Sequence, residues 1–148
     1  MLKAMTTAAL ILAAAGAYAQ DDLTIASLAN GKDTRAQFGR MTKGRDLPRW
    51  VTKGGTNSPT REVGLGGARY RVLSACKPHD CASERMAVLY SADGKKMAGV
   101  YSVVNEKTAS EKLVWLNVDG KESIDGKTVL YAALSGSLEN HPQAFDFK

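Results

Sequence analysis

Residues 68–92 read ARYRVLSACKPHDCASERMAVLYSA, and most of the fold can be worked out from this stretch. Two runs rich in Val, Leu and Tyr, 68–76 and 85–92, flank a short polar loop that contains both cysteines of the chain. In the first run apolar residues alternate with polar ones, as at Tyr70 and Val72, and this period of two is typical of a half-buried β-strand. So short a connection favours antiparallel neighbours, because parallel strands need a crossover of about a dozen residues or more. The stretch therefore predicts two antiparallel strands joined by a cysteine-containing loop.

Further runs of the same kind lie on both sides of this stretch. We expect them to form strands at 61–65, 96–104 and 112–118, separated by turns and loops. Residues 53–60 are expected to be a loop because they are rich in Gly, Asn, Ser and Pro. Consecutive strands with short connections predict an antiparallel meander.

Helical signals occupy the two ends of the chain. Asp22 is a candidate N-cap for a helix over 23–29, and Asp33 for a second helix over 34–44 that ends at Gly44. A third helix is expected over 125–138, since four of its apolar residues can share one face: Val129, Leu130, Ala133 and Leu134. The sequence thus predicts an α+β fold, with a central antiparallel β-sheet flanked by helices and the cysteine loop protruding between two strands.

The first nineteen residues have the pattern of an export signal. Lys3 precedes an apolar run, and the small-x-small residues at 17–19 are typical of a signal-peptidase site, so cleavage is expected after Ala19. The apolar run is shorter than the roughly 20 residues that span a bilayer. We therefore expect a periplasmic protein with one domain over 20–148 and no membrane segment in the mature form.

Charge and motifs exclude several functional classes. The formal net charge is +5, and removal of Lys3 with the signal takes it from +5 to +4. This charge is not gathered in runs, so nucleic-acid binding is not expected. The chain has no nucleophile elbow and no zinc-protease motif. Trp50 and Trp115 lie in apolar runs and are expected in the core, and His141 in a surface turn. The protein is therefore not expected to be an enzyme or to need a cofactor.

The loop between the two strands allows three interpretations. Cys76, His79, Asp80 and Cys81 carry atoms that bind metals, but their spacing is not that of a structural zinc site, so we expect no metal. Redox chemistry is the second interpretation, although reactive pairs usually have a C-x-x-C spacing. The third is a disulfide, which persists in exported proteins. Closing a six-residue ring stabilises a fold by only about 2 kcal/mol. Such a bridge is better explained as support for a rigid binding loop, in which Pro78 fixes its own backbone. A stapled turn with no binding role is the alternative that composition alone leaves open.

At the residues SACKPHDC, 74–81, the chain resembles the Ivy family, the inhibitors of vertebrate lysozyme. The resemblance extends, in the same order, to segments over nearly all of the mature chain: QDDLTIASLA, LPRWVTKGGT, EKTASEKLVWLNV, SIDGKTVL and GSLENHP. It implies a periplasmic inhibitor that inserts a Cys76–Cys81-closed loop into the active-site cleft of C-type lysozyme. His79 is then the residue that contacts the catalytic carboxyl groups, with Lys77, Pro78 and Asp80 completing the binding loop.

The resemblance has consequences for partners and pH dependence. A protonated imidazole donates hydrogen bonds from both nitrogens, so we expect tighter inhibition at mildly acidic pH. C-type lysozymes are basic, as this chain is, so affinity has to come from short-range fit rather than from electrostatic steering. The implied role is protection of peptidoglycan during evasion of host defence. Alternatives are regulation of endogenous lytic transglycosylases by the same loop and a thiol-redox or metal-binding protein. A homodimer is an expected alternative to a monomer.

Overall fold

The computed structural model of the protein describes residues 23–119 and 123–147. The expected export signal and its cleavage site after Ala19 lie outside these ranges. Among the residues that are described, no helix is long and apolar enough to cross a membrane.

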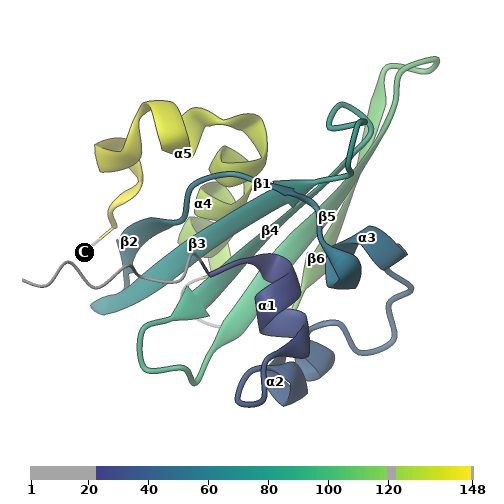
Figure 1. The fold of residues 1–148 in the computed structure, drawn as a ribbon. Coiled ribbons are helices and arrows are strands. Elements are labelled where there is room, and N and C mark those ends of the chain that lie inside the picture. Colours follow the sequence, from purple (N-terminus) through teal and green to yellow (C-terminus); the bar gives the residue numbers. More distant parts are fainter. Residues whose placement is uncertain (1–22, 120–122, 148) are drawn as a thin grey trace, which may run out of the picture.

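Strands β1 to β6 of the described chain form one sheet, in which every pairing is antiparallel (Figure 1). Their bounds are β1 (Thr56–Asn57), β2 (Arg61–Leu65), β3 (Ala68–Cys76), β4 (Glu84–Ser91), β5 (Met97–Asn105) and β6 (Ser110–Leu116). The order across the sheet is β1-β3-β4-β5-β6, and β2 also pairs with β3. The meander predicted from the sequence is therefore confirmed. The short strand β1 lies within 53–60, where only a loop was expected.

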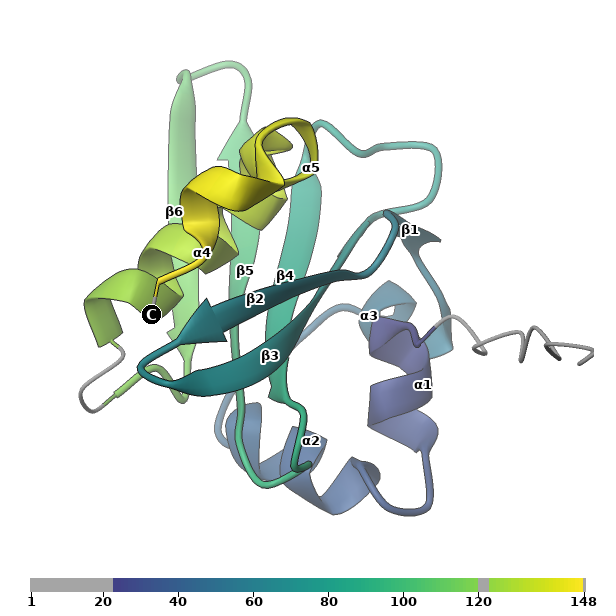
Figure 2. The same ribbon diagram turned by 90° about the vertical axis from the view of Figure 1, so that its left-hand side faces the viewer.

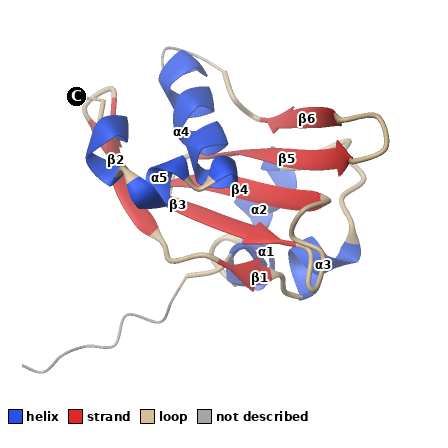
Figure 3. Ribbon diagram, turned by 90° about the horizontal axis from the view of Figure 1, so that it is seen from above, coloured by secondary structure: helices blue, strands red, loops and turns tan. Residues whose placement is uncertain are grey.

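Helices cover both faces of this sheet (Figures 2 and 3). On one face lie α1 (Ile25–Asn30), α2 (Arg35–Met41) and α3 (Arg49–Lys53). On the other lie α4 (Ser123–Ser135), α5 (Ser137–Asn140) and the 3-10 helix η1 (Pro142–Phe145). The predicted α+β class, a central antiparallel sheet flanked by helices, is confirmed.

Each face of the sheet has its own hydrophobic cluster. The cluster under α1–α3 contains Ile25, Leu28, Phe38, Met41, Val51, Leu73, Ala75, Met86, Val88, Met97, Tyr101 and Leu116. The cluster under α4 and α5 contains Val63, Leu65, Tyr70, Val72, Ala87, Leu89, Val100, Val129, Leu130, Ala132, Leu134 and Leu138. Because the central strand β4 is buried on both faces, its sequence MAVL is continuously apolar rather than alternating.

The N-terminal helices differ in detail from the expectation. Thr24 is the N-cap of α1 and forms a reciprocal capping box with Ser27, whereas Asp22, the expected cap, lies outside the described residues. Asp33 does not cap α2, whose N-cap position is taken by Thr34 without a side-chain cap bond. The helix also ends at Met41, before the expected stop at Gly44.

Two further local features were not resolved by the sequence pattern. Helix α3 is only five residues long, too short to show a helical period, and it begins directly after Pro48. The helix expected over 125–138 is interrupted at Gly136, which adopts a φ of 82° between α4 and α5. Glycine reaches this left-handed conformation without steric penalty, so the chain turns there.

Candidate functional site

The cysteine loop joins β3 to β4 at one end of the sheet, the end that also carries the β5–β6 hairpin turn (Figure 1). Cys76 and Cys81 form a disulfide with their Cα atoms 4.8 Å apart, as predicted. Both cysteine sulfur atoms are thereby bonded to each other, so neither is a free thiolate that could bind a metal. The site is best described as a closed ring at the edge of a rigid scaffold.

The tip of the ring is a tight turn with His79 at a conformationally demanding position. The amide of Asp80 donates to the carbonyl of Lys77 at 3.0 Å, which closes a four-residue turn. Pro78 occupies the second position of this turn, and His79, in the third, has a φ of 62°. Proline followed by a positive φ is the pattern of a type II turn, where glycine or asparagine is usual. Histidine therefore stands where a smaller residue would be less strained, and both Pro78 and His79 are exposed.

Lys77 and Asp80 have partners inside the loop. The ammonium nitrogen of Lys77 lies 3.3 Å from Asp80 Oδ2 and 3.1 Å from Glu84 Oε1. Asp80 Oδ2 also accepts a hydrogen bond of 2.6 Å from the hydroxyl of Ser83. The bonds from Ser83 and then Lys77 hold the pKa of Asp80 below its ordinary value. The bonds to Glu84 and then Asp80 raise the pKa of Lys77. Both charges are thus engaged within the ring and its base.

Glu84 connects this loop to the hydrophobic core. Its Oε2 accepts hydrogen bonds from Trp50 Nε1 at 2.9 Å and from the Tyr101 hydroxyl at 2.7 Å. The bond from Trp50 contributes most to holding the pKa of Glu84 below its ordinary value of 4.5, with further contributions from Tyr101 and Lys77. Burial, followed by the bond to Glu84, raises the pKa of Tyr101. Loop, strand β4 and helix α3 therefore meet at one carboxylate.

Sequence reasoning missed Glu84, because the strand was expected to begin one residue later, at Arg85. The signal was present in the register of the strand. Glu84, Met86 and Val88 are spaced by two, so a charged residue stands on the face of β4 that otherwise packs into the core. A carboxylate in such a position indicates a specific set of hydrogen-bond donors nearby.

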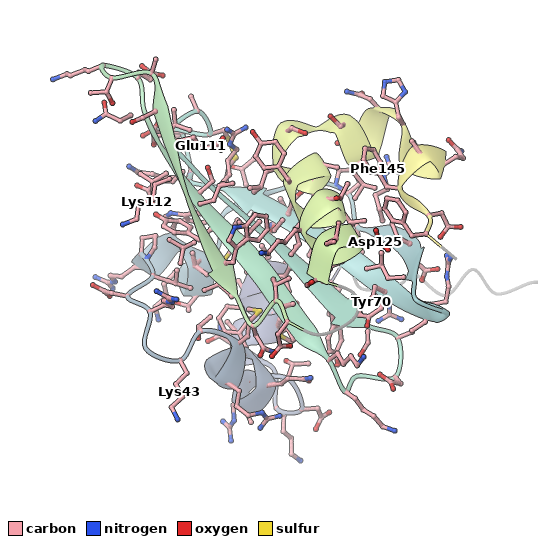
Figure 4. All side chains as sticks on the ribbon, turned by 180° about the vertical axis from the view of Figure 1, so that it is seen from behind. Lys43, Tyr70, Glu111, Lys112, Asp125 and Phe145 are labelled. Atoms are coloured by element: carbon pink, nitrogen blue, oxygen red, sulfur yellow. A yellow bond between two sulfur atoms is a disulfide. The ribbon has the colours of Figure 1, made fainter. Side chains whose placement is uncertain are left out.

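A second polar cluster lies on the opposite face of the same end of the sheet. Glu111, labelled in Figure 4, accepts hydrogen bonds from Ser102 at 2.5 Å and from the Tyr131 hydroxyl at 3.1 Å, and it lies 3.5 Å from Arg85 NH2. Arg85 also donates to the carbonyl of Leu134 at 3.1 Å. The first two residues of β4, Glu84 and Arg85, therefore tie the start of this strand to α3 on one face and to α4 on the other.

The two tryptophans lie against the hydrophobic clusters, and His141 lies at the surface. Trp50 is half-buried against the core, 6.5 Å from the ring of Tyr101. Trp115 is half-buried against the hydrophobic cluster under α4 and α5, with the ammonium nitrogen of Lys127 5.3 Å from its ring centre. His141 is exposed in the turn between α5 and η1, as expected. Of the predicted loop residues, the structure exposes Pro78 and His79 at the tip and turns Lys77 and Asp80 toward the base.

Comparison with known proteins identifies relatives over the whole chain. The family model described as inhibitor of vertebrate lysozyme (Ivy) matches residues 33–126, which include the cysteine loop. The proteins named inhibitor of vertebrate lysozyme from Escherichia coli strains K12 and O157:H7 are each 57% identical over 148 residues, covering 100% of this chain and 94% of the relative. A protein of the same name from Pseudomonas aeruginosa is 32% identical over 88 residues, 58% of each chain.

Proposed function

The chain belongs to the Ivy family, the inhibitors of vertebrate lysozyme, and on that premise we propose that it inhibits C-type lysozyme by inserting the 76–81 ring into the active-site cleft. The family consists of inhibitor proteins and not of enzymes. The observation that carries the proposal is the presentation of His79: an exposed imidazole on a turn that a disulfide and Pro78 hold in place.

The chemistry of the cleft suits an imidazole. Lysozyme cleaves a glycosidic bond with two carboxyl groups, one protonated and one ionised, which in retaining enzymes lie about 5 Å apart. The two ring nitrogens of His79 point in different directions, so a single imidazole can bond to both groups. A protonated imidazole donates both hydrogen bonds, and bonds between ions are about twice as strong as neutral ones. The loop contains no glycosidic bond, so it fills the cleft without being cleaved.

The shape of the loop favours affinity through preorganisation. Binding does not need to freeze the ring, because the disulfide, the turn and the ion pairs of Lys77 already do so. Lys77 and Asp80 then act on lysozyme mainly by shaping the loop, since their charged groups have partners at its base. Residues 1–19 are proposed to direct the protein to the periplasm, where it would protect peptidoglycan.

The test is hydrolysis of bacterial cell walls by a C-type lysozyme, with wild-type protein or with the His79→Ala variant added. Stoichiometric inhibition by the wild type and loss of most of it in the variant is the expected result. Equal inhibition by both would move the binding surface away from the loop. Inhibition by neither would count against lysozyme as the target, and lytic transglycosylases, which attack the same polymer, would be assayed next.

A further inference from the structure

Glu84 lies outside the cysteine ring, at the first position of β4, and only 19% of its side chain is exposed. We propose that Glu84 is a positioning residue for the inhibitory loop: it fixes the orientation of the ring on the end of the sheet through Lys77. The inference rests on the proposed function, because that function gives the orientation of the ring its importance.

The disulfide alone does not fix that orientation. It constrains the six residues of the ring relative to one another, but the ring joins the sheet by two unequal stems. Cys76 is the last residue of β3 and pairs with Arg85, whereas Cys81 is followed by two residues before β4 begins. Along this second stem Ala82 is exposed, and Ser83 is held by the bond from the amide of Val104 to its carbonyl at 2.8 Å. An additional link between ring and body therefore changes how firmly the tip is oriented.

One such link is the backbone bond from the amide of Lys77 to the carbonyl of Glu84 at 3.0 Å, and the side chain of Glu84 supplies a second. One oxygen is bound to the core by Trp50 and Tyr101, and the other binds the ammonium group of Lys77 at 3.1 Å. Lys77 lies inside the ring and continues the chain of contacts to Asp80 at 3.3 Å. The backbone turn between Lys77 and Asp80 holds His79 at its third position. A continuous set of polar contacts thus runs from helix α3 to the turn that presents the imidazole.

A role in stability alone makes different predictions. The ion pair is partly exposed, with 40% of the Lys77 side chain accessible, and such pairs add little net stability because solvent screens their attraction. If Glu84 served only the fold, its replacement would change the free energy of unfolding and leave the affinity of the folded protein unchanged. If it positions the loop, the folded protein itself binds less tightly and its loop amides exchange faster.

The experiment compares Glu84→Gln with Lys77→Met, with the double variant and with Glu62→Gln as a matched control. Glu62 also forms an ion pair, with Arg69 at 3.5 Å, but it lies on β2, far from the loop along the sheet. Inhibition of lysozyme and hydrogen exchange of the Asp80 and Ser83 amides are measured on each folded variant at pH 7. Lys77→Met keeps the test decisive if Glu84→Gln does not fold, because it removes the link and leaves the bonds from Trp50 and Tyr101 in place.

We expect Glu84→Gln to inhibit at least tenfold more weakly, which corresponds to a competent loop population of about one tenth. The two amides should exchange faster in Glu84→Gln and Lys77→Met but not in Glu62→Gln. The double variant should inhibit lysozyme as well as the less effective of the two single variants, because both substitutions break the same link. Wild-type inhibition and unchanged exchange in Glu84→Gln would overturn the proposal. If wild-type protein fails to inhibit lysozyme, the proposed function fails, while the exchange of the two amides still tests the positioning role.

Discussion

Removal of the Cys76–Cys81 disulfide by the double replacement Cys76→Ser, Cys81→Ser separates two roles of the bridge. In the chain-entropy model a six-residue ring restricts the unfolded chain by about 2 kcal/mol. In the variant, this free energy is lost either from the stability of the fold or from the affinity for lysozyme. If the loop keeps its shape, the free energy of unfolding falls by about 2 kcal/mol and affinity is unchanged. If the loop loosens in the folded protein, stability is largely retained and affinity falls instead, by as much as about 30-fold.

The structure favours the second outcome. Most residues from 78 to 82 are exposed, and the ring contacts the body chiefly through Lys77. Without the bridge the exposed part gains conformational freedom at little expense in buried contacts. We therefore expect the free energy of unfolding to fall by less than about 1 kcal/mol and inhibition to weaken by at least about tenfold.

The assay pairs urea unfolding, followed by circular dichroism, with titration of lysozyme activity on the same samples. Wild-type protein treated with reductant is the matched control, because it keeps the cysteine side chains. A variant that loses the full 2 kcal/mol or so of stability yet inhibits as well as the wild type would refute the reasoning, since the loop would then keep its shape unaided.

Three further predictions concern the base of the loop, the ionisation of Glu84 and the N-terminus. A methyl group added in Gly55→Ala would lie 2.7 Å from the carbonyl oxygen of Cys76 and 2.9 Å from the ring of Trp50. We therefore expect the free energy of unfolding, measured in urea, to fall by about 1–3 kcal/mol and inhibition to weaken. Because the pKa of Glu84 is lowered in the folded protein, its ionised form stabilises the fold. This contribution is complete above the ordinary pKa of 4.5 and is lost as pH falls through the lower pKa of the folded state. In urea titrations, the difference in free energy of unfolding between wild type and Glu84→Gln should therefore shrink below that pH. Mass spectrometry of protein from the periplasmic fraction should show a chain that begins at Gln20, and a retained leader would contradict the expected cleavage.

Much of the sheet could be predicted from local sequence patterns. Strand β3 has the bounds expected from the alternation at Tyr70 and Val72, and the disulfide was predicted from two cysteines in a sequence that begins with the pattern of an export signal. Helix boundaries were less predictable, because they depend on contacts between distant segments. The hydroxyl of Thr34 donates to the carbonyl of Leu28 instead of capping α2, and no pattern within the helix itself indicates this bond.

The internal organisation of the loop was only partly accessible from the sequence. A histidine beside proline in a cysteine ring indicated a presented side chain, and the structure exposes His79. The partners of Lys77 depend on hairpin register: Cys76 pairs with Arg85, which places Lys77 next to Glu84 across the strands. The bonds from Trp50 and Tyr101 join residues 34 and 17 positions from Glu84, so they emerge only when helix and sheet are packed together. The contact of His79 with lysozyme itself stays a prediction.

The most direct measurement of the central claim is a competition experiment in the cleft of lysozyme. Binding of wild-type protein to a C-type lysozyme is measured by calorimetry at increasing concentrations of a soluble N-acetylglucosamine oligosaccharide that occupies the cleft. If the ring of residues 76–81 fills the cleft, the apparent dissociation constant rises linearly with the sugar concentration, by the factor one plus the ratio of that concentration to the sugar's own dissociation constant. An unchanged dissociation constant, with sugar and protein bound together, would contradict insertion of the loop.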